Sequence, residues 1–349
     1  RSIIAMSEQD GYTTSVEWDP GGGRIATVSS DNVTRIWNAE TGELGASLNG
    51  HRANVRMAVW SPDGRRIATA SDDATVMIWD AASGRGLTQK QHRDAVVKVA
   101  WSPDGNQVAS ADSEGVHIWA PDQQQSVTLR NSDSQTVRNF AWSPDGTQLA
   151  IGSGLWSVGI WDARTGEEAT RFAGNDMDAE RIVWSPDGKL VAIASLVGAG
   201  SVWDAKSGLQ VAVLRGHDGS IKDIAWSANG HWIATVSTDT TMRIWDPASG
   251  REISRYGDRE AVMAWDPAGK RLASYVASRA VEIRPVPPEN LPLWLDCALG
   301  QVPVVGLPDV RDDFFLAAAP QQGSAAARLQ ENYADRYAVA REACAALLQ

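Results

Sequence analysis

Tryptophan recurs at a nearly constant spacing along most of the 349-residue chain. One series precedes a turn, with gaps of 42, 41, 41, 42, 42 and 39 residues, and consists of Trp18, Trp60, Trp101, Trp142, Trp184, Trp226 and Trp265. A second series ends the repeated phrase, with gaps of 42, 40, 42, 42 and 42 residues, and consists of Trp37, Trp79, Trp119, Trp161, Trp203 and Trp245. A chain with such a period builds one structural unit many times.

Each unit has the pattern of four short β-strands joined by turns. In the second unit, "VRMAVWS" alternates in polarity, and "TVMIWD" is rich in β-branched and aromatic residues, as strands are. "RIATAS" lies between them, and the short, polar "GLTQK" follows them. Pro62 and Gly64 supply the backbone angles of the first turn. Turns at this spacing predict an all-β protein.

The repeated unit resembles the WD40 repeat, in which about 40 to 45 residues form one four-stranded blade of a β-propeller. Trp-Asp pairs end four units, at Trp79-Asp80, Trp161-Asp162, Trp203-Asp204 and Trp245-Asp246. Gly-His pairs precede two units, at Gly50-His51 and Gly216-His217. The resemblance covers residues 1–286 and implies a seven-bladed propeller, which leaves residues 287–349 as a C-terminal extension.

The N-terminus is expected to close the ring of blades. The seventh unit supplies only three strands before "PPENLP", which cannot continue a ladder. The segment "IIAMSEQ" (residues 3–9) aligns with "VAVLRGH" (residues 211–217). Each segment ends nine residues before the next tryptophan of the first series: Gln9 before Trp18, and His217 before Trp226. An N-terminal fourth strand would remove two exposed sheet edges.

The resemblance also implies a buried network of a histidine, an aspartate and the third-strand tryptophan in each blade. Two units match in full, with His51, Asp73 and Trp79 in one and His217, Asp239 and Trp245 in the other. His92 has Ser113 at the aspartate position, and the fourth, fifth and seventh units have Leu155, Val197 and Ser278 there. A His–Asp pair also suggests catalysis, but no nucleophile motif lies beside either pair. We therefore interpret the pairs as structural and expect no enzyme.

Charge and cysteine content exclude several classes of partner. The formal charge is −11 and the pI about 5.0, which argues against nucleic acid or an anionic membrane as the main partner. The two cysteines, Cys297 and Cys344, form no disulfide framework or zinc motif and suit a reducing, cytoplasmic setting. No nucleotide-binding, metalloprotease or calcium-loop motif occurs, so we expect neither cofactor nor metal.

Function is expected at positions that the fold leaves free. The residue four before each first-series tryptophan should lie near one mouth of the central channel, and around the ring it is Thr14, Arg56, Val97, Arg138, Glu180, Lys222 and Ala261. Three cations on an acidic protein, Arg56, Arg138 and Lys222, suggest a site for an acidic or phosphorylated segment of a protein. Scattered, solvated charge is the alternative.

Two turns carry apolar residues where charge is usual. Leu155 and Trp156 lie in the fourth unit, and Leu196 and Val197 lie in the fifth. Together they form a second candidate contact surface, since exposed apolar patches commonly mark interfaces. The alternative is that these side chains fold inward over a blade that lacks its aspartate.

The C-terminal extension predicts an amphipathic helix over residues 324–348, where apolar residues recur every three to four positions. The regular "SPDG" units and the following "LPLWL" are similar to bacterial WD40-repeat chains, in which a propeller often follows a signalling or effector domain. Arg1 in place of methionine indicates a processed product or a piece of a longer chain.

We therefore predict a non-catalytic scaffold or sensor that binds a protein or peptide through the channel mouth. The alternative is a regulatory or assembly domain of a larger enzyme, such as an ATPase, a kinase or a caspase-like protease. A propeller enzyme that uses the channel as its pocket is a third reading.

Overall fold

The computed structural model describes residues 13–123, 126–130, 137–153, 157–172, 179–257, 263–265, 271–276 and 280–285. All regular elements in these ranges are β-strands, which confirms the all-β prediction. The described part contains no helix, and therefore none that is long and apolar enough to cross a membrane.

The strands form antiparallel sheets, each built from consecutive strands of one repeat. The first blade consists of β1 (Thr13–Trp18), β2 (Arg24–Ser29), β3 (Thr34–Asn38) and β4 (Leu44–Leu48). The second consists of β5 (Val55–Trp60), β6 (Arg66–Ser71), β7 (Thr75–Asp80) and β8 (Gly86–Gln91). The third consists of β9 (Lys98–Trp101), β10 (Val108–Ala111), β11 (Val116–Trp119) and β12 (Ser126–Leu129).

The remaining blades repeat this order. The fourth consists of β13 (Val137–Trp142), β14 (Gln148–Ser153), β15 (Ser157–Asp162) and β16 (Glu168–Arg171). The fifth consists of β17 (Arg181–Trp184), β18 (Leu190–Ala194), β19 (Ala199–Asp204) and β20 (Gln210–Arg215). The sixth consists of β21 (Ile221–Trp226), β22 (Ile233–Ser237), β23 (Met242–Trp245) and β24 (Glu252–Tyr256). The seventh has three described strands, β25 (Met263–Trp265), β26 (Arg271–Val276) and β27 (Ala280–Pro285).

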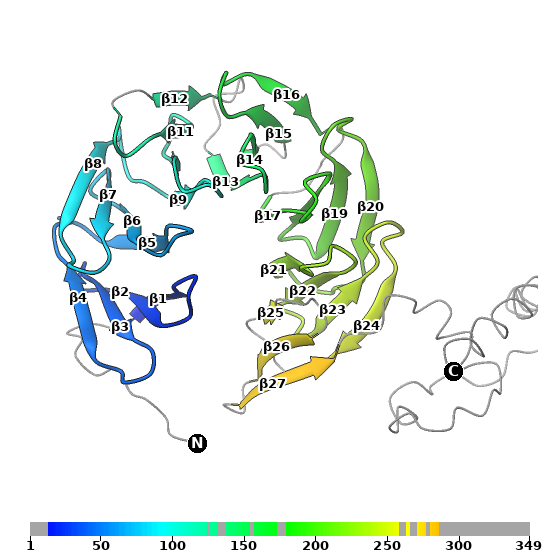
Figure 1. Ribbon diagram of the computed structural model, residues 1–349. Coiled ribbons are helices and arrows are strands. Elements are labelled where there is room, and N and C mark those ends of the chain that lie inside the picture. The colour runs from blue at the N-terminus through cyan, green and yellow to red at the C-terminus, as the bar shows by residue number, and fades with distance from the viewer. Residues whose placement is uncertain are drawn as a thin grey trace, which may run out of the picture. The chain divides into compact units, whose positions relative to one another are not determined.

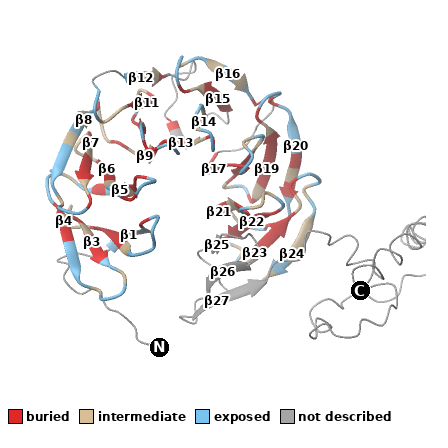
Figure 2. Ribbon diagram, in the orientation of Figure 1, coloured by how far each residue is buried: buried red, intermediate tan, exposed pale blue. Residues whose placement is uncertain are grey.

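The first strand of each blade lies nearest the central space, and the fourth strand lies outermost (Figure 1). Burial is greatest in the second and third strands of a blade (Figure 2). The second strand β6 is buried along nearly its whole length, whereas the outer strand β8 is mostly exposed. The second and third strands of a blade have neighbouring sheets on both faces, so most of their side chains are apolar or small rather than alternating in polarity.

The hydrophobic core is divided among the boundaries between blades. Five clusters each combine buried residues from two neighbouring sheets, from the first and second through to the fifth and sixth. Between the third and fourth blades, for example, Leu129 and Val116 belong to the same cluster as Phe140 and Leu149. No single sheet has a core of its own, which is why the repeat must be stacked to be stable.

The first-series tryptophans join each blade to the preceding one. Their Nε1 groups donate to backbone carbonyls of the preceding first strand at 3.0–3.4 Å: Trp60 to Glu17, Trp101 to Val59, Trp142 to Ala100, Trp184 to Ala141, Trp226 to Val183 and Trp265 to Ala225. The same ring supplies a large apolar surface to the boundary. One residue type therefore meets both the polar and the apolar requirement there.

Two arginines reinforce the first two boundaries. Arg66 at the start of β6 lies over the ring of Trp101 at 4.6 Å, and its Nη2 donates to the carbonyl of Gly105 at 2.7 Å. Arg24 makes the same pair of contacts with Trp60 and Gly64. Each guanidinium thus reaches the next blade through a cation–π contact and a hydrogen bond.

Strand β1 makes no such contacts with a preceding blade among the described residues. Trp18 is 56% exposed and Val16 is 59% exposed. The N-terminal strand (residues 3–9) that we expect to complete the seventh blade lies outside the described residues, as does the helix predicted over residues 324–348. Both stay predictions, together with the division at residue 286.

We expect Arg66→Ala to lower the free energy of unfolding by about 1–3 kcal/mol, since it removes one cation–π contact and one hydrogen bond between blades. Arg65→Ala is the matched control, because Arg65 is its exposed neighbour in the same turn. Urea denaturation of the three proteins, followed by tryptophan fluorescence, measures the difference. Equal losses in both variants would contradict a bridging role for Arg66.

Candidate functional site

The second and sixth blades contain the predicted histidine network. His51 Nδ1 lies 2.9 Å from Asp73 Oδ2, and its Nε2 lies 2.7 Å from the hydroxyl of Thr69. Trp79 Nε1 donates to that hydroxyl at 2.8 Å. Hydrogen bonds thus connect Asp73 in the turn, through His51 and Thr69, to Trp79. In the sixth blade, the corresponding distances are 2.8, 2.7 and 2.8 Å among His217, Asp239, Thr235 and Trp245.

This hydroxyl–imidazole–carboxylate order is that of a hydrolase triad, but the hydroxyl is enclosed. Thr69 is 1% exposed and Thr235 is fully buried, and each already accepts a hydrogen bond from a tryptophan. No substrate carbonyl can reach such an oxygen. The network instead joins the loop before the first strand to the turn between the second and third strands.

The third blade has the same network, which corrects the sequence assignment of Ser113 to the aspartate position. His92 Nδ1 lies 3.0 Å from Asp112 Oδ2, its Nε2 lies 3.0 Å from Ser110 Oγ, and Trp119 Nε1 donates to Ser110. The turn is one residue shorter here. Four residues (112–115) separate the paired ends Ala111 and Val116, whereas five (71–75) separate their second-blade equivalents.

The fifth blade packs its tryptophan in another way. Ile193 stands where the second blade has Thr69, and Trp203 Nε1 donates at 2.8 Å to Ser201, the cross-strand neighbour of Ile193. The buried ring of Phe172 stacks on Trp203 with centroids 5.2 Å apart and planes inclined by 3°. Aromatic stacking thus replaces the histidine contact in this blade.

The apolar turns are described only in part. Leu155 and Trp156 lie outside the described residues. Val197 is 71% exposed, and Leu196 is half-buried with its carbonyl accepting a hydrogen bond from Ser220. Val197 therefore does not fold inward, and the proposed contact surface around Leu155 and Trp156 stays a prediction.

The candidate mouth residues lie on the first strands. Arg56 on β5 and Lys222 on β21 are exposed, on blades that face each other across the central space (Figure 1). Arg138 occupies the same position on β13, and Glu180 directly precedes β17. Arg56 Nε bonds to Asp72, and Glu180 offers its backbone carbonyl to Asn139 at 2.6 Å. The described contacts do not join Arg56, Glu180 and Lys222 to one another.

One residue further along the first strands of the third to sixth blades, polar side chains link neighbouring blades. Lys98 Nζ on β9 donates to Asn139 Oδ1 at 2.5 Å and to the Phe140 carbonyl at 2.7 Å. Arg181 Nε on β17 lies 3.7 Å from Asp223 Oδ1 on β21. We call Lys98, Asn139, Arg181 and Asp223 the channel belt.

Burial perturbs the ionisation of the belt. It lowers the pKa of the Lys98 ammonium to about 8, and the charge of Arg181 acts in the same direction. Burial also raises the pKa of Asp223 above its usual value, against the opposing effect of Arg181. Both shifts reflect the cost of holding a charge away from water.

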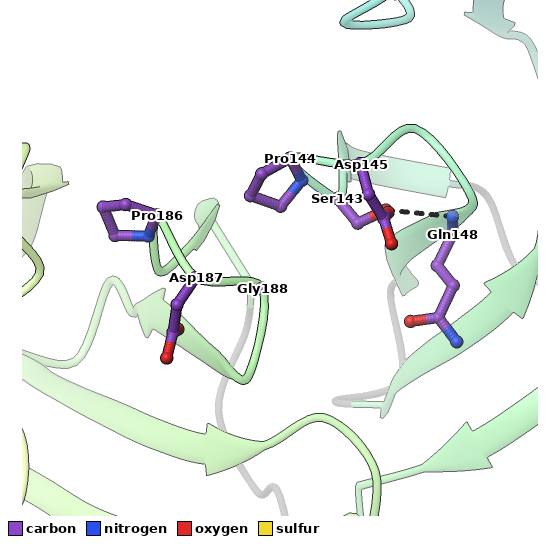
Figure 3. Close-up of a pocket in the computed structure, with 7 residues that line it drawn as sticks. All are labelled: Ser143, Pro144, Asp145, Gln148, Pro186, Asp187 and Gly188. Atoms are coloured by element: carbon purple, nitrogen blue, oxygen red, sulfur yellow. Dashed lines mark hydrogen bonds between the residues drawn. The ribbon is translucent and has the colours of Figure 1, made fainter.

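A surface pocket of about 300 Å³ lies between the first turns of the fourth and fifth blades (Figure 3). It is lined by Ser143, Pro144, Asp145, Gln148, Pro186, Asp187 and Gly188. Ser143 Oγ donates to Asp145 Oδ1 at 2.6 Å and accepts from the Gln148 backbone N–H at 2.9 Å, so this serine stabilises its own turn. Gln148 occupies the position that Arg24 and Arg66 have in the first two blades, where each arginine reaches the turn of the next blade. The side chain of Gln148 is shorter than arginine, and the pocket lies at this place. Its lining offers neither an imidazole nor a thiol.

Sequence reasoning missed the channel belt and the two residues Asp112 and His117. The belt was detectable, since its members stand three residues before the first-series tryptophans and are unlike one another. Asp112 could not be detected in this way. The turn before β11 is one residue shorter than in the second blade, so Asp112 lies one residue before the expected position.

Comparison with known proteins agrees with this architecture. A family model described as the first β-propeller of IFT122 matches residues 12–206, more than half of the chain, and a WD domain, G-beta repeat model matches residues 208–246. The β-propeller domain of Cps50 (Swd1) from Myceliophteria thermophila is similar in structure, with a TM-score of 0.62 and 18% identity, over 80% of this chain and 98% of that one. At this identity the likeness shows the fold alone. No individual curated protein matched. With its repeated four-stranded sheets and inter-blade tryptophans, the chain belongs to the WD40-repeat β-propeller family.

Proposed function

We propose that this propeller is a non-catalytic binding module that recognises an acidic or phosphorylated segment of another protein at the channel mouth. Its fold suggests a protein-interaction scaffold, as is typical of WD40 propellers. The observation that carries the finer proposal is a concentration of cations at the inner strands of a chain whose formal charge is −11. Another domain of the same chain would serve as the partner equally well.

The first strands of the blades, which lie nearest the central space, carry several cations although the chain as a whole is acidic. Their described cations are Arg56, Lys98, Arg181 and Lys222, to which Arg138 adds a fifth by its position on β13. The acidic residues that accompany them are Glu17 on β1, Glu180 and Asp223. Burial raises the pKa of Glu17 to about 7 and the pKa of Asp223 above its usual value, so it favours the neutral form of both. A cationic mouth on an acidic protein attracts anionic segments and repels cationic ones.

The Arg56–Asp72 pair is suited to exchange. The side chains are 45% and 33% exposed, and a pair this exposed stabilises the fold by only about 0–1 kcal/mol. A ligand carboxylate or phosphate can therefore take the place of Asp72 at little cost. A guanidinium binds either group through two parallel hydrogen bonds, which lysine cannot do.

The non-catalytic part of the proposal rests on the enclosure of the histidine networks and on the make-up of the pocket. Each triad-like hydroxyl is buried and occupied, and the inter-turn pocket holds carboxylates that stabilise their own turns. A cytoplasmic setting stays a prediction.

Charge reversal of the mouth, by Arg56→Glu, Arg138→Glu and Lys222→Glu together, should weaken binding of a glutamate-rich or phosphoserine peptide at least about tenfold. Raising the salt concentration should weaken binding by the unmodified protein as well, because the attraction is between charges near the surface. Fluorescence anisotropy with a labelled peptide measures both effects, once circular dichroism shows that the variant is folded.

The matched control reverses two arginines and one lysine at the opposite ends of the strands, by Arg65→Glu, Arg85→Glu and Lys189→Glu. All three are exposed and lie in turns that follow first or third strands. This control should bind the peptide as the unmodified protein does. If both triple variants lose affinity equally, net charge rather than the mouth accounts for binding.

Binding of a glutamate peptide should weaken by about threefold or more between pH 7 and pH 9. Lys98 is protonated below its pKa of about 8 and neutral above it, so an attractive charge is lost as the pH rises. Glutamate side chains stay ionised throughout this interval and do not contribute to the change.

The Lys98→Met variant provides the control for this pH dependence. It should bind more weakly at pH 7 and show a smaller change in affinity between pH 7 and pH 9. The remaining change would reflect Glu17 on β1, whose pKa burial raises to about 7. A dependence that persists unchanged in the variant would show that another group titrates.

A further inference from the structure

The third blade brings two imidazoles and a carboxylate together. His92 Nδ1 lies 3.0 Å from Asp112 Oδ2, and His117 Nε2 lies 3.0 Å from Asp112 Oδ1. One nitrogen of each ring and a carboxylate oxygen all lie within 4.8 Å of one another. The side chains of His92 and Asp112 are each 1% exposed, and that of His117 is 12% exposed. The cluster is thus enclosed except on the His117 side.

The fold does not require His117. It stands two residues before the third-strand tryptophan, where the second blade has Met77 beside a complete network. In the first and sixth blades, this position holds Arg35 and Arg243, each paired with the aspartate of its own blade, Asp31 or Asp239, at 2.8 and 3.5 Å. Among the described blades, an imidazole faces the network carboxylate from this position only in the third.

The outer nitrogen of each ring is held by a hydroxyl. His92 Nε2 lies 3.0 Å from Ser110 Oγ, and His117 Nδ1 lies 3.1 Å from Thr128 Oγ1 on the outer strand β12. Imidazoles that bind metals commonly give their second N–H to a neighbouring acceptor. Zinc binding would therefore place the N–H of each ring on its outer nitrogen, next to the hydroxyl, and leave the inner nitrogen without a proton and facing the ion. The two rings stand nearly perpendicular, with centroids 4.9 Å apart, so they approach Asp112 from different directions.

The surroundings of Asp112 favour the charged form of its carboxylate, which is the form that binds metal ions. Burial acts to raise the pKa of Asp112, but hydrogen bonds from His117 and His92 outweigh it and hold the pKa far below its usual value. The ammonium of Lys90 interacts with the same carboxylate and lies over the Trp119 ring at 5.6 Å. The cluster therefore already attracts positive charge.

We propose that His92 Nδ1, His117 Nε2 and a carboxylate oxygen of Asp112 bind one divalent transition-metal ion. Two imidazoles and one carboxylate suit zinc, which accepts three protein ligands with a water in the fourth position. Ligand atoms around zinc lie roughly 3.3 Å apart at Zn–N distances of about 2.0–2.1 Å. Movements on the order of 1 Å in the side chains of His92, His117 and Asp112 would bring their ligand atoms to that separation.

A competing account gives His117 the role that arginine has in the first and sixth blades. In that account, His117 serves only as the hydrogen-bond partner of Asp112, and no metal binds. The two accounts differ in what they predict for His117→Met. The metal site loses a ligand, whereas the histidine network keeps the composition of the second blade.

The test is calorimetric titration of the full chain with ZnCl2, after chelation and dialysis. We expect one tight site per chain with a Kd of about 1 μM or below, and a rise in Tm on zinc addition. His117→Met should weaken that site at least tenfold and remove the rise in Tm. Thr128→Val should weaken it by about tenfold, because it removes the hydroxyl that orients His117.

Two further variants sharpen the assignment. Lys90→Met should strengthen zinc binding, since it removes a competing positive charge next to Asp112. His231→Met, which removes an exposed imidazole in the turn between β21 and β22, should leave the tight site unchanged. Absorption of the cobalt-substituted protein should show nitrogen and oxygen ligands without thiolate bands.

Several outcomes would overturn the proposal. They are the absence of tight zinc binding, a tight site unaffected by His117→Met, and thiolate bands that assign the ion to Cys297 or Cys344. Zinc binding that falls equally in His117→Met and His231→Met would identify surface imidazoles as the ligands.

Discussion

From Trp60 onward, each first-strand tryptophan spans the boundary between two blades, and the arrangement of the described blades depends on this contact. Its N–H bonds to a carbonyl of the preceding first strand, and its ring fills the space between the two sheets. A four-stranded sheet with two apolar faces cannot be stable alone, and stacking such sheets buries both faces at once. The period of the sequence is therefore the length of chain that forms one four-stranded blade, from one boundary tryptophan to the next.

The same geometry separates positions that the fold needs from positions that it leaves free. Second-strand residues are small and apolar because sheets lie on both faces. By contrast, the third-strand position two before the tryptophan holds Arg35, Met77, His117 or Arg243 without altering the sheet. The first-strand position that holds Met57, Lys98, Asn139, Arg181 and Asp223 varies equally freely. Binding chemistry can change there at little cost in stability, and both proposals made above rest on such positions.

The strands and their order could be predicted from the sequence because period, alternation and turn residues all indicate the same unit. The histidine networks of the second and sixth blades also followed, since their spacing matches in full. The third blade did not follow, because counting from Trp119 assumed a turn of the usual length and so selected Ser113 over Asp112. The stacking of Phe172 on Trp203 has no signal in a local pattern, since Phe172 follows β16 of the fourth blade and Trp203 lies on β19 of the fifth.

The sequence by itself determined the repeating unit, the antiparallel order of its strands and the residues that join blade to blade. These depend on contacts that recur at one fixed spacing, so the pattern appears many times over. Tertiary structure alone decided which side chains of unrelated position meet: Lys98 with Asn139, Arg56 with Asp72, and His117 with Asp112. Each of these pairs depends on a turn length or on the angle between neighbouring sheets, and a one-residue change in either brings a different pair together.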